Sequence, residues 1–127
     1  MLLVKTYLDK SSISGIGLFA AEPIEEGTLV WKLNDLDIVI HERDLKAKNL
    51  SDVEMQFVER VCYMNGNTYY ICIDDARFMN HSNDPNTYEK GQSSIARRRI
   101  EAGEEITADY GNYDDSKKHL PYAQKAD

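Results

Sequence analysis

The chain has 127 residues, of which 42% are hydrophobic and 29% are charged, and its formal net charge is −7. This length predicts one domain, and the composition is that of a globular protein and not of a disordered chain. The negative charge disfavours direct binding to nucleic acid, which calls for a basic surface. Without a membrane-length apolar run or a secretory signal, we expect a soluble intracellular protein of the cytoplasm or nucleus, with secretion into a host left open.

Short strands separated by turns dominate the pattern along the chain. Strands are expected at residues 2–7, 18–20, 28–33, 36–40, 69–73, 94–98 and 105–108. One helix is expected after Ser51, because Ser51 and Glu54 have the spacing of a capping box and apolar residues then recur at helical spacing from Val53 to Cys62. The pattern therefore predicts a mainly β, α+β fold with one inserted helix and several small sheets.

The two cysteines, Cys62 and Cys72, fall in apolar surroundings, the first on the apolar side of the expected helix. Buried free thiols are therefore expected rather than a disulfide. A structural zinc site needs about four ligands, and the residues after Gly111 contain no cysteine and one histidine. No metal site is expected.

A polar segment from Arg77 to Asn86 contains the run Asn80-His81-Ser82, which is dense in hydrogen-bond donors and acceptors. Pro85 favours an extended or turning path there, so the segment is not expected to be helical. Its end alone, Asn-Asp-Pro-Asn, is an ordinary turn signal. A second segment, Glu105-Ile106-Thr107-Ala108-Asp109-Tyr110-Gly111, follows at a short distance.

A third segment, Ser14-Gly15-Ile16-Gly17-Leu18-Phe19-Ala20, lies near the N-terminus. By itself it is typical of a turn or bulge between strands. It is not a dinucleotide-binding fingerprint, because the third glycine is missing and strand-like residues follow where a helix should begin.

Together the three segments resemble the SET domain of protein-lysine methyltransferases, and the resemblance runs from Ser14 to Gly111. It implies a single SET domain over residues 1–127, with an insert at about residues 41–70 and a tail at 112–127. It also implies small curved sheets and a C-terminal segment that is threaded under a loop, so that the segments from Arg77 to Asn86 and from Glu105 to Gly111 meet.

The resemblance implies transfer of a methyl group from S-adenosylmethionine to the ε-amine of a lysine in a protein. The residues that match the cofactor-binding positions of the family are Gly15, Ile16, Gly17, Asn80 and His81. Tyr110 matches the catalytic tyrosine. The candidates for the channel that admits the lysine are Tyr63, Tyr88 and Tyr113, and the residues alone do not choose among them.

This chain departs from many SET enzymes in three places. The cysteine-rich zinc module that often follows the domain is absent from residues 112–127. Asn83 stands where a cysteine is frequent, and Ile73-Asp74 stands where Gly-Asn is frequent. Ala108 occupies a position where an aromatic residue often influences how many methyl groups are added, so methylation multiplicity stays open.

A competing hypothesis is a catalytically inactive SET-fold module that binds basic peptides; the intact Asn80, His81 and Tyr110 argue against it. Residues 101–127 carry seven acidic side chains and three lysines. An acidic surface near Tyr110 would attract a basic, lysine-containing protein substrate. The run Arg97 to Arg99 is too short for a nucleic-acid site and is expected to be a solvated strand end. A homodimer is compatible with the sequence.

Overall fold

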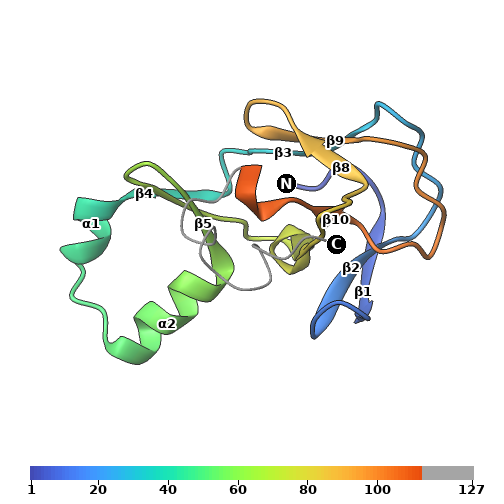
Figure 1. Cartoon of the computed structure of the whole chain (residues 1–127). Coiled ribbons are helices and arrows are strands. Elements are labelled where there is room, and N and C mark those ends of the chain that lie inside the picture. Colours follow the sequence, from blue (N-terminus) through green and yellow to red (C-terminus); the bar gives the residue numbers. More distant parts are fainter. Residues whose placement is uncertain (113–127) are drawn as a thin grey trace.

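The computed structural model describes residues 1–112, which form small sheets and two helices (Figure 1). The strands are β1 (Thr6–Lys10), β2 (Ile16–Ala20), β3 (Leu29–Lys32), β4 (Ile38–His41), β5 (Cys62–Asn65), β6 (Thr68–Ile71), β7 (Asn80–His81), β8 (Thr87–Glu89), β9 (Ser93–Ala96) and β10 (Thr107–Ala108). The helices are α1 (Glu42–Lys46) and α2 (Asp52–Val61), and 3₁₀ turns span Asp75–Phe78 and Tyr110–Asn112.

The strands pair into four sheets within this part of the chain. The hairpin β1–β2 is antiparallel, as are the sheets ordered β3-β9-β8 and β4-β6-β5. The fourth pair, β7 with β10, is parallel. The mainly β architecture with small sheets and an inserted helix agrees with the sequence prediction.

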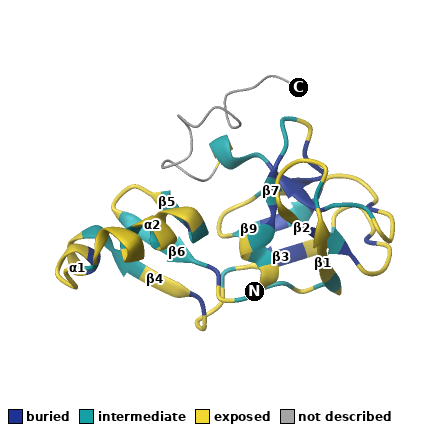
Figure 2. Ribbon diagram, turned by 90° about the horizontal axis from the view of Figure 1, so that it is seen from below, coloured by how far each residue is buried: buried dark blue, intermediate teal, exposed yellow. Residues whose placement is uncertain are grey.

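One apolar core lies among β2, β3, β9 and β10, where Figure 2 shows most of the buried ribbon. Its buried members are Leu18, Ala20, Ile24, Val30, Met79, Ala96, Ile100, Ile106 and Ala108. Three of these, Met79, Ile106 and Ala108, lie in or next to the two motif segments around Asn80 and Tyr110. Burying them therefore holds the motif segments in place as part of the core.

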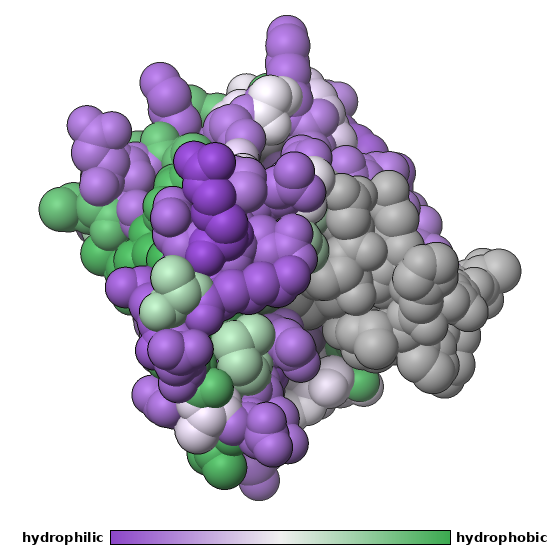
Figure 3. Space-filling model, turned by 90° about the vertical axis from the view of Figure 1, so that its left-hand side faces the viewer, coloured by the Kyte–Doolittle hydropathy of each residue, from purple (hydrophilic) through white to green (hydrophobic). Residues whose placement is uncertain are grey.

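The insert is a separate lobe built from the sheet β4-β6-β5 with α1 and α2, to the left in Figure 1. The capping box predicted at the start of α2 is confirmed: Ser51 Oγ accepts from the Glu54 N–H at 3.2 Å, and Glu54 Oε1 accepts from the Ser51 N–H at 3.0 Å. The expected burial of the apolar side of α2 is not found. Val53 is 76% and Phe57 50% exposed, and apolar patches lie among hydrophilic side chains on this end of the molecule (Figure 3).

Several element bounds differ from the prediction for local reasons. The first strand begins at Thr6 and not at Leu2, because it pairs with β2 from Thr6↔Ala20 to Lys10↔Ile16. Cys62 is the first residue of β5 and not part of the helix. Helix α1 was not predicted, because five residues carry too little periodicity; His41 caps it.

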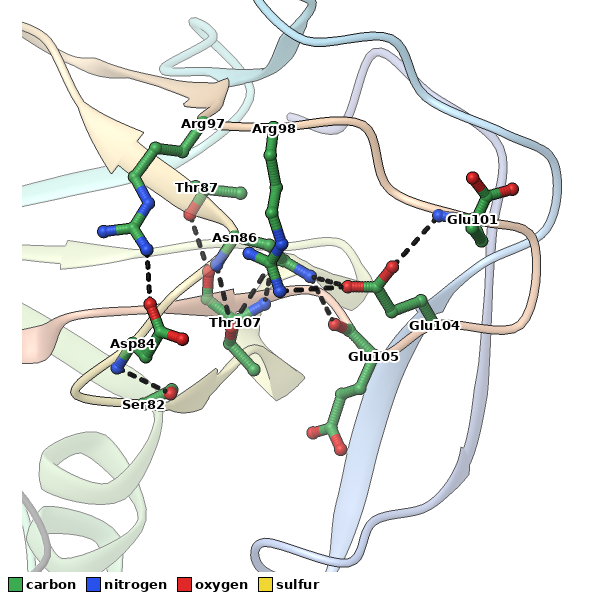
Figure 4. A network of polar contacts seen from close by, with 10 residues as sticks. All are labelled: Ser82, Asp84, Asn86, Thr87, Arg97, Arg98, Glu101, Glu104, Glu105 and Thr107. Carbon is green, nitrogen blue, oxygen red and sulfur yellow. Dashed lines mark hydrogen bonds and ion pairs between the residues drawn. The ribbon is translucent and has the colours of Figure 1, made fainter. Parts of the chain in front are cut away.

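The parallel pair β7–β10 joins the two motif segments through residues 27 positions apart in sequence. Thr107 lies opposite Asn80, and Ala108 lies opposite His81. Asn86, which is 2% exposed, braces this pair: its Oδ1 accepts from the Thr107 N–H at 2.9 Å, and its Nδ2 donates to the Glu105 carbonyl at 2.7 Å (Figure 4). The meeting of the two motifs that the resemblance implied is therefore present.

The run Arg97 to Arg99 forms ion pairs at the surface close to this network. The partners are Asp84 for Arg97, Glu104 for Arg98, and Glu25 and Glu101 for Arg99. Each of these arginines is exposed, so the pairs contribute little to stability. Their charges are also partly neutralised by these carboxylates.

We predict that Asn86→Ala lowers the free energy of unfolding by about 3 kcal/mol, because it leaves the buried Thr107 N–H and the Glu105 carbonyl without their partner. Urea unfolding followed by circular dichroism measures this. The exposed Asn67→Ala is the matched control and should change stability by less than about 0.5 kcal/mol. Equal effects of the two substitutions would contradict the bracing role of Asn86.

Candidate functional site

The glycine segment at the start of β2 lies against Asn80 of β7. The Nδ2 of Asn80 donates to the Ser14 carbonyl at 3.0 Å and to Glu105 Oε2 at 2.9 Å, and lies 3.4 Å from the Ile16 carbonyl. The structure therefore brings together the predicted cofactor residues at Gly15–Gly17 and Asn80. It adds Glu105, which the sequence did not single out.

The two glycines of this segment lack a side chain for different physical reasons. Gly15 has a φ of +48°, a backbone conformation that side chains disfavour. Gly17 has ordinary dihedrals, but a Cβ there would overlap the carboxylate of Glu105. That carboxylate is held by Ser11 Oγ at 2.7 and 2.9 Å. Glycine at position 17 therefore lets an acidic side chain approach the backbone beside Asn80.

His81 is buried, and its ring ties the two motif segments together. Its Nδ1 accepts from the backbone N–H of Tyr110 at 3.1 Å, so in this pattern the ring proton lies on Nε2, 2.6 Å from Oδ1 of Asn83. The His81 and Tyr110 rings lie with their centroids 5.3 Å apart. His81 therefore positions the segment that carries Tyr110.

The hydroxyl of Tyr110 donates to the carbonyl of Met79 at 2.5 Å. Because the single O–H proton is donated there, the phenol oxygen can take part in other hydrogen bonds only as an acceptor. Tyr110 also lines a cavity of about 240 Å³ between the insert and the sheet β3-β9-β8. The proposed catalytic tyrosine thus lies at the surface of a space that a side chain could enter.

Of the three candidate channel tyrosines, the structure brings Tyr63 to this cavity. Its ring stacks on Tyr70 at 4.8 Å and meets the edge of Trp31 at 6.3 Å, which holds it as a fixed wall. Burial raises the pKa of Tyr63, so its phenol stays protonated. Tyr88 is 43% exposed and does not line the cavity. Tyr113 lies outside the described residues.

Glu89 also lines the cavity, although sequence reasoning missed it. Burial raises the pKa of Glu89 from an ordinary 4.5 to about 7, against a smaller lowering by Ser94, whose Oγ lies 2.8 and 2.9 Å from the two carboxylate oxygens. A signal was available, because successive side chains of a strand point to opposite faces. With Thr87 inward and Tyr88 outward, Glu89 points inward again. The strand Thr87–Glu89 was too short to be recognised.

The cysteines are buried free thiols, as predicted, and both line the cavity. Burial raises the pKa of the Cys72 thiol to about 12, with a further contribution from Asp37. A thiol in this state is not a nucleophile at neutral pH. Within residues 1–112, no group of three or more His, Cys, Asp or Glu side chains is placed to hold a metal ion.

Comparison with known proteins settles the family. The family model described as SET domain matches residues 15–111. The chain belongs to the SET-domain family. This SET domain is 31% identical over 121 residues to histone-lysine N-methyltransferase ATXR7 of Arabidopsis thaliana, covering 80% of this chain and 8% of that protein. It is also 31% identical over 130 residues to human histone-lysine N-methyltransferase 2D, covering 91% of this chain and 2% of that protein.

A solved structure from Plasmodium falciparum, named a "putative histone methyltransferase", has the same fold with a TM-score of 0.58 and 20% identity. The match covers 84% of this SET domain and 93% of that chain. The predicted SET fold is therefore confirmed. The chain spans 8% or less of the length of the two curated relatives above. Among the described residues, no helix is long and apolar enough to cross a membrane.

We predict that Glu89 makes stability depend on pH. The folded protein holds a proton on Glu89 up to a pH of about 7, whereas the unfolded chain releases it near 4.5. The stabilisation is therefore complete below about pH 4.5 and is lost as the pH rises to about 7, a loss of roughly 3 kcal/mol.

Glu89→Gln has no such proton to lose. Between about pH 4.5 and pH 7.5, wild type should lose roughly 3 kcal/mol of unfolding free energy relative to this variant, measured by urea unfolding across a pH series. Exposed Glu26→Gln is the matched control and should track wild type at every pH. A constant difference between wild type and Glu89→Gln across the series would show that Glu89 titrates normally.

Proposed function

We propose that this SET domain transfers a methyl group from S-adenosylmethionine to the ε-amine of a lysine in a protein substrate. The observation that carries the proposal is the placement of Tyr110. Its backbone is tied to the cofactor-side motif through His81, and its side chain lines the cavity between the insert and the β3 sheet. The names of the relatives, all histone-lysine N-methyltransferases, support the same reaction.

The residues around the glycine segment fit the amino-acid end of S-adenosylmethionine. Glu105, the carbonyls of Ser14 and Ile16, and the side-chain oxygen of Asn80, whose Nδ2 donates to these groups, are acceptors suited to an ammonium group. Gly15 adds open space beside the backbone. When bound, S-adenosylmethionine supplies a methyl group on a positively charged sulfur that an amine can attack.

A lysine must lose its proton before its nitrogen can act as a nucleophile. For a pKa near 10.4, the neutral amine costs about 4.6 kcal/mol at pH 7. The cavity walls include the apolar side chains of Val61, Cys72 and Met79, and an apolar surrounding disfavours the ammonium form. The cavity therefore lowers part of this cost by desolvation.

Tyr110 orients the neutral amine. Because its own proton is donated to the Met79 carbonyl, the phenol oxygen accepts an N–H from the amine. That hydrogen bond fixes the direction of the nitrogen lone pair, so that the amine reaches the methyl group in a reactive orientation. The cavity-side position of Tyr63 supports a role in confining the lysine side chain.

The substrate is proposed to be a basic, lysine-containing protein, in keeping with the net charge of −7. The direct test is incubation of the purified protein with labelled S-adenosylmethionine and a panel of core histones and other lysine-rich proteins. Transfer of label to lysine is the expected result. Cofactor binding without transfer to any protein in the panel would favour the inactive binding module instead.

We predict that Tyr110→Phe keeps the fold and the cofactor affinity but lowers the methylation rate by about 10²–10³, because it removes a group that orients the reacting amine. Single-turnover transfer measures the rate, and thermal unfolding checks the fold. Tyr88→Phe is the matched control, since Tyr88 lies outside the cavity. A Tyr110→Phe enzyme within tenfold of wild type would contradict the assignment.

We predict that Asn80→Ala weakens S-adenosylmethionine binding by about tenfold or more, because a charge-assisted hydrogen bond to the cofactor is lost. Calorimetric titration measures the affinity, and the folded state is confirmed by circular dichroism. Asn67→Ala, an exposed asparagine of the insert, should bind as wild type does. Unchanged affinity in Asn80→Ala would mean that the Asn80 segment is only a structural turn.

A further inference from the structure

One wall of the cavity combines a carboxylate with aromatic rings. Ser94 of β9 pairs with Trp31 of β3, and the Ser94 hydroxyl contacts the Glu89 carboxylate. Trp31 in turn meets the ring of Tyr63. All of these residues line the same cavity as Tyr110. Aromatic faces and a carboxylate are the groups that attract a cation.

Glu89 differs in the sign of its charge from the two arginines that line the cavity. Arg60 and Arg77 also line it, and they lie over the rings of Phe57 and Phe78 at 5.4 and 5.1 Å. Two guanidinium groups by themselves would repel an ammonium ion. Among the described residues that line the cavity, Glu89 is the only acid. A lysine that enters this space therefore meets one negatively charged group among these residues, the carboxylate of Glu89.

We propose that Glu89 receives the ammonium group of the substrate lysine in this cavity and accepts its proton. This inference rests on the proposed methyl transfer and adds a residue to it. An N–H bond of the ammonium breaks, an O–H bond forms on Glu89, and a neutral amine and a neutral carboxylic acid remain. The acid then returns its proton to solvent after turnover.

The physical surroundings favour this transfer. An ion pair in a partly buried cavity is costly to desolvate, whereas the neutral pair of amine and acid is not. Burial already brings the pKa of Glu89 to about 7, the range in which a proton acceptor works best at neutral pH. Its hydroxyl partner Ser94 can keep a hydrogen bond to the carboxyl group in either protonation state.

The test uses the full chain and the histone-tail peptide that wild type methylates best, made with lysine, norleucine or arginine at the target position. In Glu89→Gln, the lysine peptide should bind about tenfold more weakly or worse, whereas the norleucine peptide should bind as before. The single-turnover rate at saturating lysine peptide should fall about tenfold at pH 7. This deficit should shrink as the pH approaches about 10, where a substantial fraction of free lysine, whose pKa is near 10.4, arrives neutral.

The other titratable and charged groups of the cavity are the same in both proteins, so the ratio of the two rates isolates Glu89; they are Arg60, Cys62, Tyr63, Cys72, Arg77 and Tyr110. Exposed Glu26→Gln removes one charge at a distance and should match wild type. Glu89→Asp keeps a carboxylate and should retain the preference for lysine over norleucine. S-adenosylmethionine affinity should be equal in all variants.

Two results would overturn the role of Glu89 while leaving the proposed function intact: an unchanged preference for lysine over norleucine in Glu89→Gln, or a rate deficit that is the same at pH 7 and pH 10. The role of Glu89 would also be overturned if Glu89→Asp lost the preference for lysine over norleucine as completely as Glu89→Gln. Packing and not charge would then be responsible for the preference. If wild type binds cofactor but neither binds nor methylates any peptide, the proposed function fails and the inference falls with it.

Discussion

The parallel pairing of β7 with β10 is the constraint on which the site depends. Two residues from each strand take part, so the ladder alone is weak, and buried Asn86 supplies the hydrogen bonds that hold it. The pairing puts Asn80 beside the glycine segment and lets His81 hold the backbone of Tyr110. Without it, the groups proposed to hold the cofactor and to orient the lysine would have no common geometry.

Two acidic side chains near the proposed chemistry, Glu105 and Glu89, have different proposed roles because their surroundings differ. Glu105 lies beside Gly17 and Asn80 and accepts from Ser11, an arrangement that suits a bound ammonium. Glu89 lies in a cavity with aromatic walls, where burial brings its pKa to about 7. In the proposed mechanism, the fixed carboxylate of Glu105 binds the ammonium group of the cofactor. The carboxylate of Glu89, which titrates near neutral pH, removes a proton from the ammonium group of the lysine.

The insert is less well packed than the rest of the described chain. Helix α2 has no buried residue, and its apolar side chains Val53 and Phe57 are exposed, although the sequence pattern suggested that they pack inward. The capping box was recognisable because it involves only neighbouring residues. Which face of the helix is covered depends on the sheet beside it, and α2 packs on that sheet at β5.

The sequence by itself determined the family, the main strands, the capped helix, the free thiols and the positions of Gly15, Gly17, Asn80 and Tyr110, because these follow from local patterns and from motif spacing. Only the tertiary structure decided that Tyr63 and not Tyr88 faces the cavity, and that Glu89 and Glu105 accompany the motifs. These side chains come from strands far apart in sequence, and their direction follows from pairing registers and burial, which short strands do not reveal.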